Sequence, residues 1–352
     1  MKSFVCTLQS GRVIFGAGSL AQLPRELELL GARHALVLST PGHADLAGRV
    51  SKLLGARASG TFSGAAMHVP VAVAREAREA AARLGADCLI AIGGGSTTGL
   101  AKAIALDSGS PIIAVPTTYA GSEMTPIFGL TEAGEKRTGR DLRVLPRTVI
   151  YDPELTLTLP VVLSVTSGLN AMAHAAEGLY ASDANPLTAL IAEEGLRALA
   201  SALPEIHRTP RDIEVRSVAL HGAWLCGMVL GNAGMALHHK LCHLLGGSFN
   251  LPHSETHAVI LPHAIAYNAP SIPDALEQMA RALGRSDPAA AFYDLARTHG
   301  APYSLRALGL AEADIDRAAG LAVTNAYWNP RPLERDGIRT LLRNAWDGTR
   351  PH

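Results

Sequence analysis

The feature that most constrains the fold of this chain is a run of three glycines at residues 93–95, because it separates two different hydrophobic patterns. Before it, residues 87–92 form a short apolar run with the length and composition of a buried β-strand. After it, residues 100–106 follow the apolar spacing of a helix. A junction of strand, glycines and helix is typical of an α/β domain whose strands are parallel and covered on both faces.

The rest of the first half repeats this alternation. Further strand-like runs occupy residues 34–39, 111–115 and 147–151. Between them, residues 71–84 are rich in Ala, Glu and Arg at helical spacing and stop at Gly85, which suits a helix end. The first half therefore predicts an α/β domain with a doubly wound parallel sheet, covered by helices on both faces.

The second half carries a different pattern, because helical segments replace the strand-like runs. These segments span residues 186–203, 215–230, 277–283, 288–299 and 311–325. Pro153 and Pro160 punctuate the transition. We therefore predict an α/β domain over residues 1–158 and an all-helical domain over residues 159–352. In such sheets ligands bind at the carboxyl ends of the strands, so we expect the active site there, in the cleft between the two domains.

Composition excludes several classes of protein. The 31 basic and 31 acidic residues balance, which argues against a nucleic-acid binder or a polybasic membrane-surface protein. The four cysteines form no CxxC pair, as is usual in a reducing compartment. We find neither an export signal nor an apolar stretch that reads as a membrane span. We expect a cytoplasmic protein that has no nucleic-acid or membrane partner, and its apolar helical surfaces favour a homodimer.

The glycine run is suited to binding an anion. Three glycines let the backbone approach a ligand closely, and the amides at the start of the following helix favour a phosphate. A second hydroxyl-rich loop follows the next strand and should lie beside the first. A tight turn that binds nothing is the alternative, since the run matches neither the GxGxxG fingerprint nor the P-loop. The predicted cofactor-binding residues are Gly93, Gly94, Gly95, Ser96, Thr97, Thr117, Thr118 and Ser122.

These motifs together resemble a known family. Gly93-Gly-Gly-Ser96 followed by Ala101-Lys102, and Pro116-Thr-Thr followed by Gly121-Ser-Glu123, are similar to motifs of the iron-containing alcohol dehydrogenase superfamily. The resemblance covers nearly the whole chain. It implies a nicotinamide-dependent oxidoreductase with a Rossmann-like N-terminal domain and a helical C-terminal domain.

Two departures from the family pattern concern the cofactor. Gly99 stands where the family usually has Asp in the helix after the glycines. The strand at residues 34–39 ends in Ser39-Thr40, where NAD-selective relatives carry Asp. Without a carboxylate there, nothing repels a 2′-phosphate. We therefore predict that both NADH and NADPH are accepted.

Histidines crowd one part of the second half: seven of the fourteen lie between His221 and His263. The resemblance implies a metal site made of an Asp and three His. His174, His243 and His253 match the three histidines, but Asn170 replaces the aspartate. An amide offers only a dipole against a divalent charge, although three imidazoles can hold zinc. We therefore predict no tightly bound metal.

The histidine-rich run is most similar to the branch of the superfamily that reduces the enone double bond of maleylacetate to 3-oxoadipate in hydroxyquinol or chlorocatechol degradation. Such a dicarboxylate suits a site rich in imidazoles. His243 and His253 are the predicted catalytic residues. The predicted substrate-binding residues are Asn170, His174, His238, His239, Lys240 and His257. A metal-dependent alcohol or hydroxy-acid dehydrogenase is the main alternative. A dehydroquinate synthase-type lyase is less favoured, because it would keep the metal carboxylate.

Overall fold

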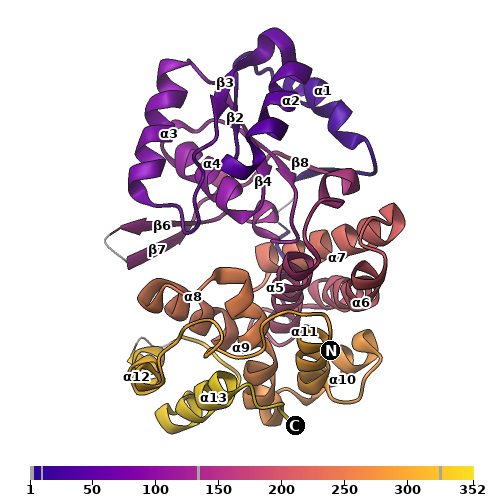
Figure 1. The fold of residues 1–352 in the computed structure, drawn as a ribbon, viewed down its shortest axis with the longest axis vertical. Helices are drawn as coiled ribbons and strands as arrows, with labels where there is room; N and C mark the ends of the chain where they lie inside the picture. Colours follow the sequence, from indigo (N-terminus) through magenta and orange to yellow (C-terminus); the bar gives the residue numbers. More distant parts are fainter. Residues whose placement is uncertain (1–3, 9–10, 133–134, 325–326) are drawn as a thin grey trace. The chain divides into compact units, whose positions relative to one another are not determined.

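The structure, a computed structural model, describes residues 4–8, 11–132, 135–324 and 327–352 (Figure 1). The chain divides into two compact units. One comprises Gln9–Leu159, and the other comprises Pro160–His352 together with the residues up to Leu8. The first unit contains the β-sheets, and the second is helical. The predicted fold class, an α/β region followed by an all-helical region, is confirmed.

A six-stranded parallel sheet forms the centre of the first unit. Its strands are β1 (Arg12–Phe15), β2 (Ala35–Leu38), β3 (Ala58–Phe62), β4 (Cys88–Gly93), β5 (Ile112–Pro116) and β8 (Thr148–Tyr151). They lie in the order β1-β8-β5-β4-β2-β3, and all neighbouring pairs are parallel. The chain runs outward from β2 to β3 in one direction and from β4 to β5 in the other. The end of β4 therefore lies where the strand order reverses, which is where open α/β sheets bind ligands.

Helices cover both faces of this sheet (Figure 1). On one face lie α1 (Leu23–Leu29) and α2 (Ala44–Leu54), and on the other lie α3 (Val71–Arg83) and α4 (Gly95–Ser108). Successive strand residues point to opposite faces, so Ile90 packs with α1 and α2 whereas its neighbour Leu89 packs with α3 and α4. The continuous apolar strands in the sequence follow from this burial on both faces.

Several elements of the first unit differ from the prediction. β1 and β3 are not predicted, because neither has a continuous run of buried aliphatic residues. The antiparallel hairpin of β6 (Ile127–Glu132) and β7 (Glu135–Arg140) is not predicted either. The first turn of α4 begins at Gly95, five residues before the predicted apolar run, because Gly, Ser and Thr are weak helix formers that conceal it.

The second unit consists of nine α-helices in the part of the chain that the structure describes. They are α5 (Val161–Leu179), α6 (Pro186–Arg208), α7 (Ile213–Asn232), α8 (Leu237–Phe249), α9 (His253–Asn268), α10 (Pro273–Leu283), α11 (Pro288–Thr298), α12 (Ile315–Thr324) and α13 (Arg335–Asp347). The five predicted helical segments correspond to α6, α7, α10, α11 and α12. Asn325, at the end of the last predicted segment, lies outside the described residues. α8, α9, α12 and α13 share one apolar core.

Helix α7 differs from the expectation that no segment has the properties of a membrane span. Its 20 residues are long and apolar enough, by length and composition, to cross a bilayer. It packs against α5 and α6, however, and its Arg216 is fully buried. That guanidinium donates hydrogen bonds to Ser164 Oγ at 2.7 Å and to the carbonyl oxygen of Pro210 at 2.9 Å. These contacts are those of a core helix in a helical domain.

Candidate active site

The glycine run lies at the junction of β4 and α4, in the first unit. β4 ends at Gly93, and the first turn of α4 begins at Gly95, with Gly94 between them. This turn contains no acidic residue. The positive end of the α4 dipole therefore faces the carboxyl edge of the sheet without an acidic side chain in that turn to offset it.

A side chain would meet different surroundings at each of the three glycines. Gly93 has φ of +145°, and a Cβ there would lie 2.6 Å from Thr97 Oγ1. A Cβ on Gly94 would lie 2.9 Å from Thr118 Oγ1, so this glycine allows the loop after β5 to pack closely. At Gly95, by contrast, the nearest atom to a Cβ is Ala120 Cβ at 3.7 Å, an ordinary contact. Packing within the protein does not require a glycine at position 95, whereas close approach of a ligand would.

Hydroxyl groups around these glycines lack partners. Thr97 Oγ1, Thr117 Oγ1 and Ser122 Oγ are buried and form no hydrogen bond with any described residue. A buried hydroxyl without a partner is costly, and a ligand that accepts or donates a hydrogen bond would remove the cost. The loop carrying Thr117 is held beside the glycines, since its backbone N–H donates to the Gly93 carbonyl oxygen at 3.0 Å. The structure thus brings all eight predicted cofactor residues to the ends of β4 and β5; we name this group the glycine cradle.

The end of β2 carries no carboxylate. Ser39 is buried, and its hydroxyl lies 2.9 Å from Ser63 Oγ. Thr40 Oγ1 lies 3.0 Å from His43 Nδ1. The hydroxyls of Ser39 and Thr40 carry no charge, so they do not repel a 2′-phosphate as a carboxylate would.

In the second unit, three helices bring six histidines together, which we name the histidine cluster. It comprises His174 on α5, His238, His239 and His243 on α8, and His253 and His257 on α9. Neighbouring ring centroids lie between 4.4 and 6.4 Å apart. The helical spacing in the sequence predicts the pair on α8, whereas the convergence of the three helices results from tertiary packing.

A buried carboxylate anchors one pair of these rings. Glu177 Oε2 on α5 lies 2.6 Å from His239 Nδ1, and His239 Nε2 lies 2.8 Å from His174 Nδ1. Glu177 also accepts hydrogen bonds from the backbone N–H groups of Ala236 and His238 at the start of α8. Sequence reasoning did not assign a role to Glu177; the available signal was its position one turn after His174 on the same helix face.

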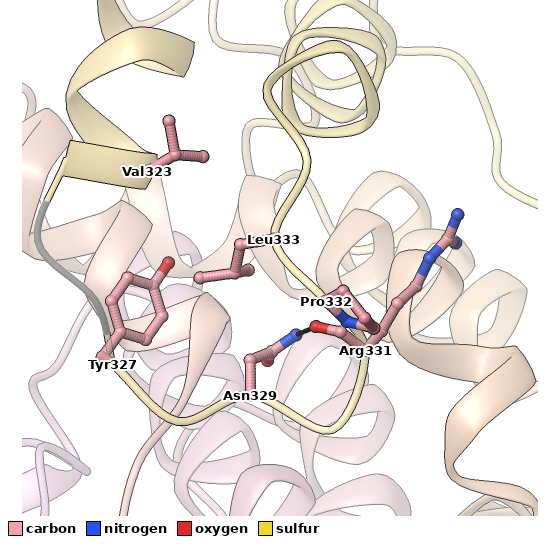
Figure 2. Close-up of a pocket in the computed structure, with 6 residues that line it drawn as sticks. All are labelled: Val323, Tyr327, Asn329, Arg331, Pro332 and Leu333. Carbon is pink, nitrogen blue, oxygen red and sulfur yellow. Dashed lines mark hydrogen bonds between the residues drawn. The ribbon is translucent and has the colours of Figure 1, made fainter.

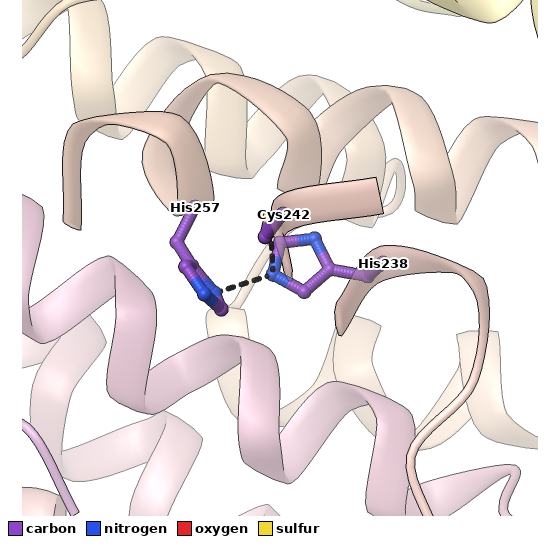
Figure 3. Close-up of side chains that lie close together, drawn as sticks. All are labelled: His238, Cys242 and His257. Carbon is purple, nitrogen blue, oxygen red and sulfur yellow. Dashed lines mark hydrogen bonds between the residues drawn. The ribbon is translucent and has the colours of Figure 1, made fainter. Parts of the chain in front are cut away.

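A second pair of rings, His238 and His257, is fully buried. His238 Nε2 lies 2.9 Å from His257 Nδ1, and Cys242 Sγ lies 3.7 Å from His238 Nε2 (Figure 3). Burial, followed by the charges of neighbouring histidines, lowers the pKa of His238 and His257 well below the usual value. Both rings are therefore neutral at pH 7, so they could serve a dianionic substrate as hydrogen-bond donors but not as cations. Burial also raises the pKa of the Cys242 thiol, so Cys242 is a core cysteine and a poor nucleophile.

The two predicted catalytic residues are the partly exposed members of the cluster. His243 and His253 are half-buried, whereas the other four histidines are buried. Their rings stack with an interplanar angle of 16° and centroids 6.4 Å apart. Lys240, predicted to hold a carboxylate, is exposed, and its Nζ lies 5.3 Å from the centre of the Tyr327 ring. Among the six histidines, His243 and His253 are therefore the two that a substrate could reach from solvent.

The residues matching the family's metal site fit a divalent ion poorly. Asn170 is buried on α5, one turn before His174, and supplies no charge. His174 Nδ1 is engaged by His239. Among the described residues, the group of three with ligand atoms within 4.8 Å of one another is instead His238, Cys242 and His257, which are already linked to each other. We assign no catalytic step to a metal at these residues.

The segment at residues 329–332 has a structural role. Asn329 donates to Asn268 Oδ1 at 2.8 Å and accepts from the backbone N–H of Leu237, so it fixes the start of α8. Its side chain also donates to the carbonyl oxygen of Arg331 at 2.7 Å (Figure 2). A small pocket of about 230 Å³ beside it contains none of the clustered histidines. Its lining residues are Val323, Tyr327, Asn329, Arg331, Pro332 and Leu333.

Comparisons with known proteins agree with these features. Residues 10–153 match the model of the iron-containing alcohol dehydrogenase family, and residues 164–346 match the C-terminal model of the Fe-containing alcohol dehydrogenase family. The chain is 60% identical over 351 residues to maleylacetate reductase of Burkholderia cepacia, covering 100% of both chains. The crystal structure of maleylacetate reductase from Agrobacterium tumefaciens has a TM-score of 0.95 at 54% identity, covering 100% of both chains. A putative alcohol dehydrogenase from Ralstonia eutropha JMP134 has a TM-score of 0.99 at 59% identity, again covering 100% of both chains.

Proposed function

The chain belongs to the iron-containing alcohol dehydrogenase family, and from this premise we propose that it is a reductase that converts maleylacetate to 3-oxoadipate with NADH or NADPH. The reaction places the protein in the degradation of aromatic compounds through hydroxyquinol or chlorocatechol. One observation carries the proposal: His243 and His253 form the accessible edge of a histidine cluster, in a chain more than half identical over its full length to enzymes of that activity.

The chemistry of the substrate suits this edge. Maleylacetate is a dianion with a carbon–carbon double bond conjugated to a ketone. Hydride addition to the carbon remote from the ketone moves negative charge onto the ketone oxygen, and a proton then completes the adjacent carbon. His243 donates a hydrogen bond to that oxygen and supplies the proton, and His253 lies beside it. One substrate, one hydride and one proton give 3-oxoadipate.

The cofactor would occupy the glycine cradle. When bound, the nicotinamide supplies the hydride. Gly95 leaves room for a phosphate at the first turn of α4, and the unpartnered hydroxyls of Thr97, Thr117 and Ser122 are available as hydrogen-bond donors. The neutral end of β2 at Ser39 and Thr40 admits either NADH or NADPH.

The free cysteines and two exposed apolar residues bear on location and assembly. All four cysteines are free, which agrees with the reducing cytoplasm. Leu190 and Val218, exposed on α6 and α7, are suited to a homodimer contact. The partner that this function requires besides the cofactor is a small-molecule dicarboxylate.

A direct assay tests the function. The purified protein is mixed with maleylacetate and NADH or NADPH, and the loss of reduced nicotinamide absorbance is followed, with fumarate and a simple aliphatic aldehyde as control substrates. Fast turnover of maleylacetate alone supports the proposal. Faster turnover of the aldehyde would favour an ordinary alcohol dehydrogenase instead.

A further inference from the structure

We propose that Lys102, a fully buried lysine on α4, is a positioning residue for the dinucleotide, because its ammonium holds the segment after β5 so that the Ser122 hydroxyl stays beside Gly95 in the glycine cradle. The inference rests on the proposed function, since it takes the glycine cradle to be the cofactor site. Nothing in the reaction itself requires a lysine here.

The contacts of Lys102 all come from one short segment. Its Nζ lies 2.6 Å from the carbonyl oxygen of Ser122, 2.7 Å from that of Thr125 and 2.8 Å from that of Ile127. It also lies 2.9 Å from Thr125 Oγ1. The lysine itself belongs to the helix whose first turn forms the cradle. One side chain thus ties the segment at residues 122–127 to the cradle helix.

Thr125 completes this network. Its hydroxyl accepts hydrogen bonds from Lys102 Nζ and from the backbone N–H of Ile127, and it donates to the carbonyl oxygen of Ser122 at 3.1 Å. The Ser122 carbonyl oxygen therefore receives both the ammonium and the threonine hydroxyl. The backbone at Ser122 is fixed from two directions.

The group that this network positions is one that needs a ligand. Ser122 Oγ is buried without a hydrogen-bond partner among the described residues. It would lie 3.9 Å from a Cβ on Gly95, the glycine that packing within the protein does not require. A small shift of the segment would remove this hydroxyl from the space beside Gly95.

Packing alone does not account for a charge at position 102. Burial lowers the pKa of Lys102 to about 7, and the nearby Glu123 carboxylate acts in the opposite direction. Glu123 is itself buried and accepts a hydrogen bond from Tyr151 Oη at 2.8 Å. A methionine would fill a similar volume without the cost of burying an ammonium. What a methionine lacks is the set of donors that fixes the loop.

Direct titration of the full-length protein with NADH, followed by nicotinamide fluorescence, tests the inference without any substrate. Thr125→Val should weaken NADH binding about tenfold, whereas Thr125→Ser, which keeps the hydroxyl, should bind within about twofold of the wild type. Ser122→Ala should also lose about tenfold. If Thr125 acts through Ser122, the double variant is only slightly weaker than either single variant. At saturating NADH, kcat of Thr125→Val should stay within about threefold of the wild type.

The matched control is Thr148→Val at the amino end of β8, which removes a buried hydroxyl bonded to Glu26 and should leave NADH affinity unchanged. Lys102→Met should weaken NADH binding more than Thr125→Val does, provided that the variant folds. If it does not fold, the comparison of Thr125→Val with Thr125→Ser tests the inference. Losses that multiply to about a hundredfold in the double variant would overturn the inference, as would wild-type affinity in Thr125→Val. A wild type that binds neither NADH nor NADPH would instead refute the proposed cofactor site, and with it the role of Lys102.

Discussion

The glycine cradle and the histidine cluster are built in opposite ways. The cradle comes from two short stretches of chain at the ends of neighbouring strands, and three of its hydroxyls have no hydrogen-bond partner in the part of the chain that the structure describes. The cluster comes from three helices, and four of its six rings are hydrogen-bonded to one another in pairs. At the strand ends, polar groups therefore remain available to bind a ligand. In the helical site, most of the polar groups already form hydrogen bonds with one another.

The largest expected effect is at the accessible edge of the cluster. His243→Ala should lower kcat by about 10²–10³, because it removes a donor from a developing oxyanion, while NADH affinity changes little. Steady-state kinetics with maleylacetate and a separate NADH titration measure the two quantities. If the variant keeps nearly full activity, the donor lies elsewhere in the cluster, and His253→Ala is the next variant to measure.

The same contrast explains what could be predicted from the sequence. Gly93–Gly95 and the two loops that carry the hydroxyls are local patterns, so their residues and their common edge could be predicted. The pairing of His239 with Glu177 and of His238 with His257 depends on how α5, α8 and α9 pack, which no spacing in the chain specifies. Burial also distinguishes His238 and His257, whose pKa it lowers, from the half-buried His243 and His253. The sequence alone does not show which histidines are buried. β1 and β3 were not predicted because they lie at the two edges of the sheet. Edge strands are less buried and therefore need fewer aliphatic residues.

The next largest effect tests whether the cradle is open for a ligand. Gly95→Ala should weaken NADH binding by at least about tenfold, because the protein leaves room for the methyl group whereas a bound phosphate would not. Thermal stability should be unchanged or raised, since alanine favours helix more than glycine. Gly48→Ala on α2, where a Cβ meets nothing within 4 Å, is the matched control and should bind NADH normally. Normal NADH binding by Gly95→Ala would place the phosphates elsewhere. Gly94→Val, by contrast, would displace Thr118 and therefore cannot separate packing from binding.

Cofactor choice tests the neutral end of β2. NADPH should serve within about tenfold of NADH, a difference of ~1.4 kcal/mol. Thr40→Asp should then depress kcat/KM for NADPH selectively, because a carboxylate there repels the 2′-phosphate. Strong rejection of NADPH by the wild type would show that another residue sets the preference.

The last effect concerns a buried histidine outside both sites, and it acts on acid stability and not on activity. Burial lowers the pKa of His263 from 6.5 to about 4, and its Nε2 has no hydrogen-bond partner among the described residues. Below pH 6.5 His263 takes up a proton in the unfolded chain, whereas in the folded protein it does so only near pH 4. The free energy of unfolding therefore decreases as the pH falls from 6.5 towards 4. His263→Leu should reduce the loss between pH 6.5 and pH 5 by about 1.5 kcal/mol in urea unfolding. An identical pH dependence in the variant would mean that His263 is already protonated in the folded protein.

The central claim is that the histidine cluster acts by donating hydrogen bonds and a proton, and not by holding a catalytic metal ion. Asn170 supplies no charge to a metal ion, and the rings of His174 and His239 are hydrogen-bonded to each other. The most direct test is the maleylacetate assay after exhaustive treatment with a strong chelator and removal of the chelator, with metal content measured on the same sample. We predict full activity with less than about 0.05 metal ions per chain, a level at which a metal-dependent enzyme would keep only that fraction of its rate. Loss of activity that zinc or iron restores would contradict the claim and identify the protein as a metal-dependent dehydrogenase of its family.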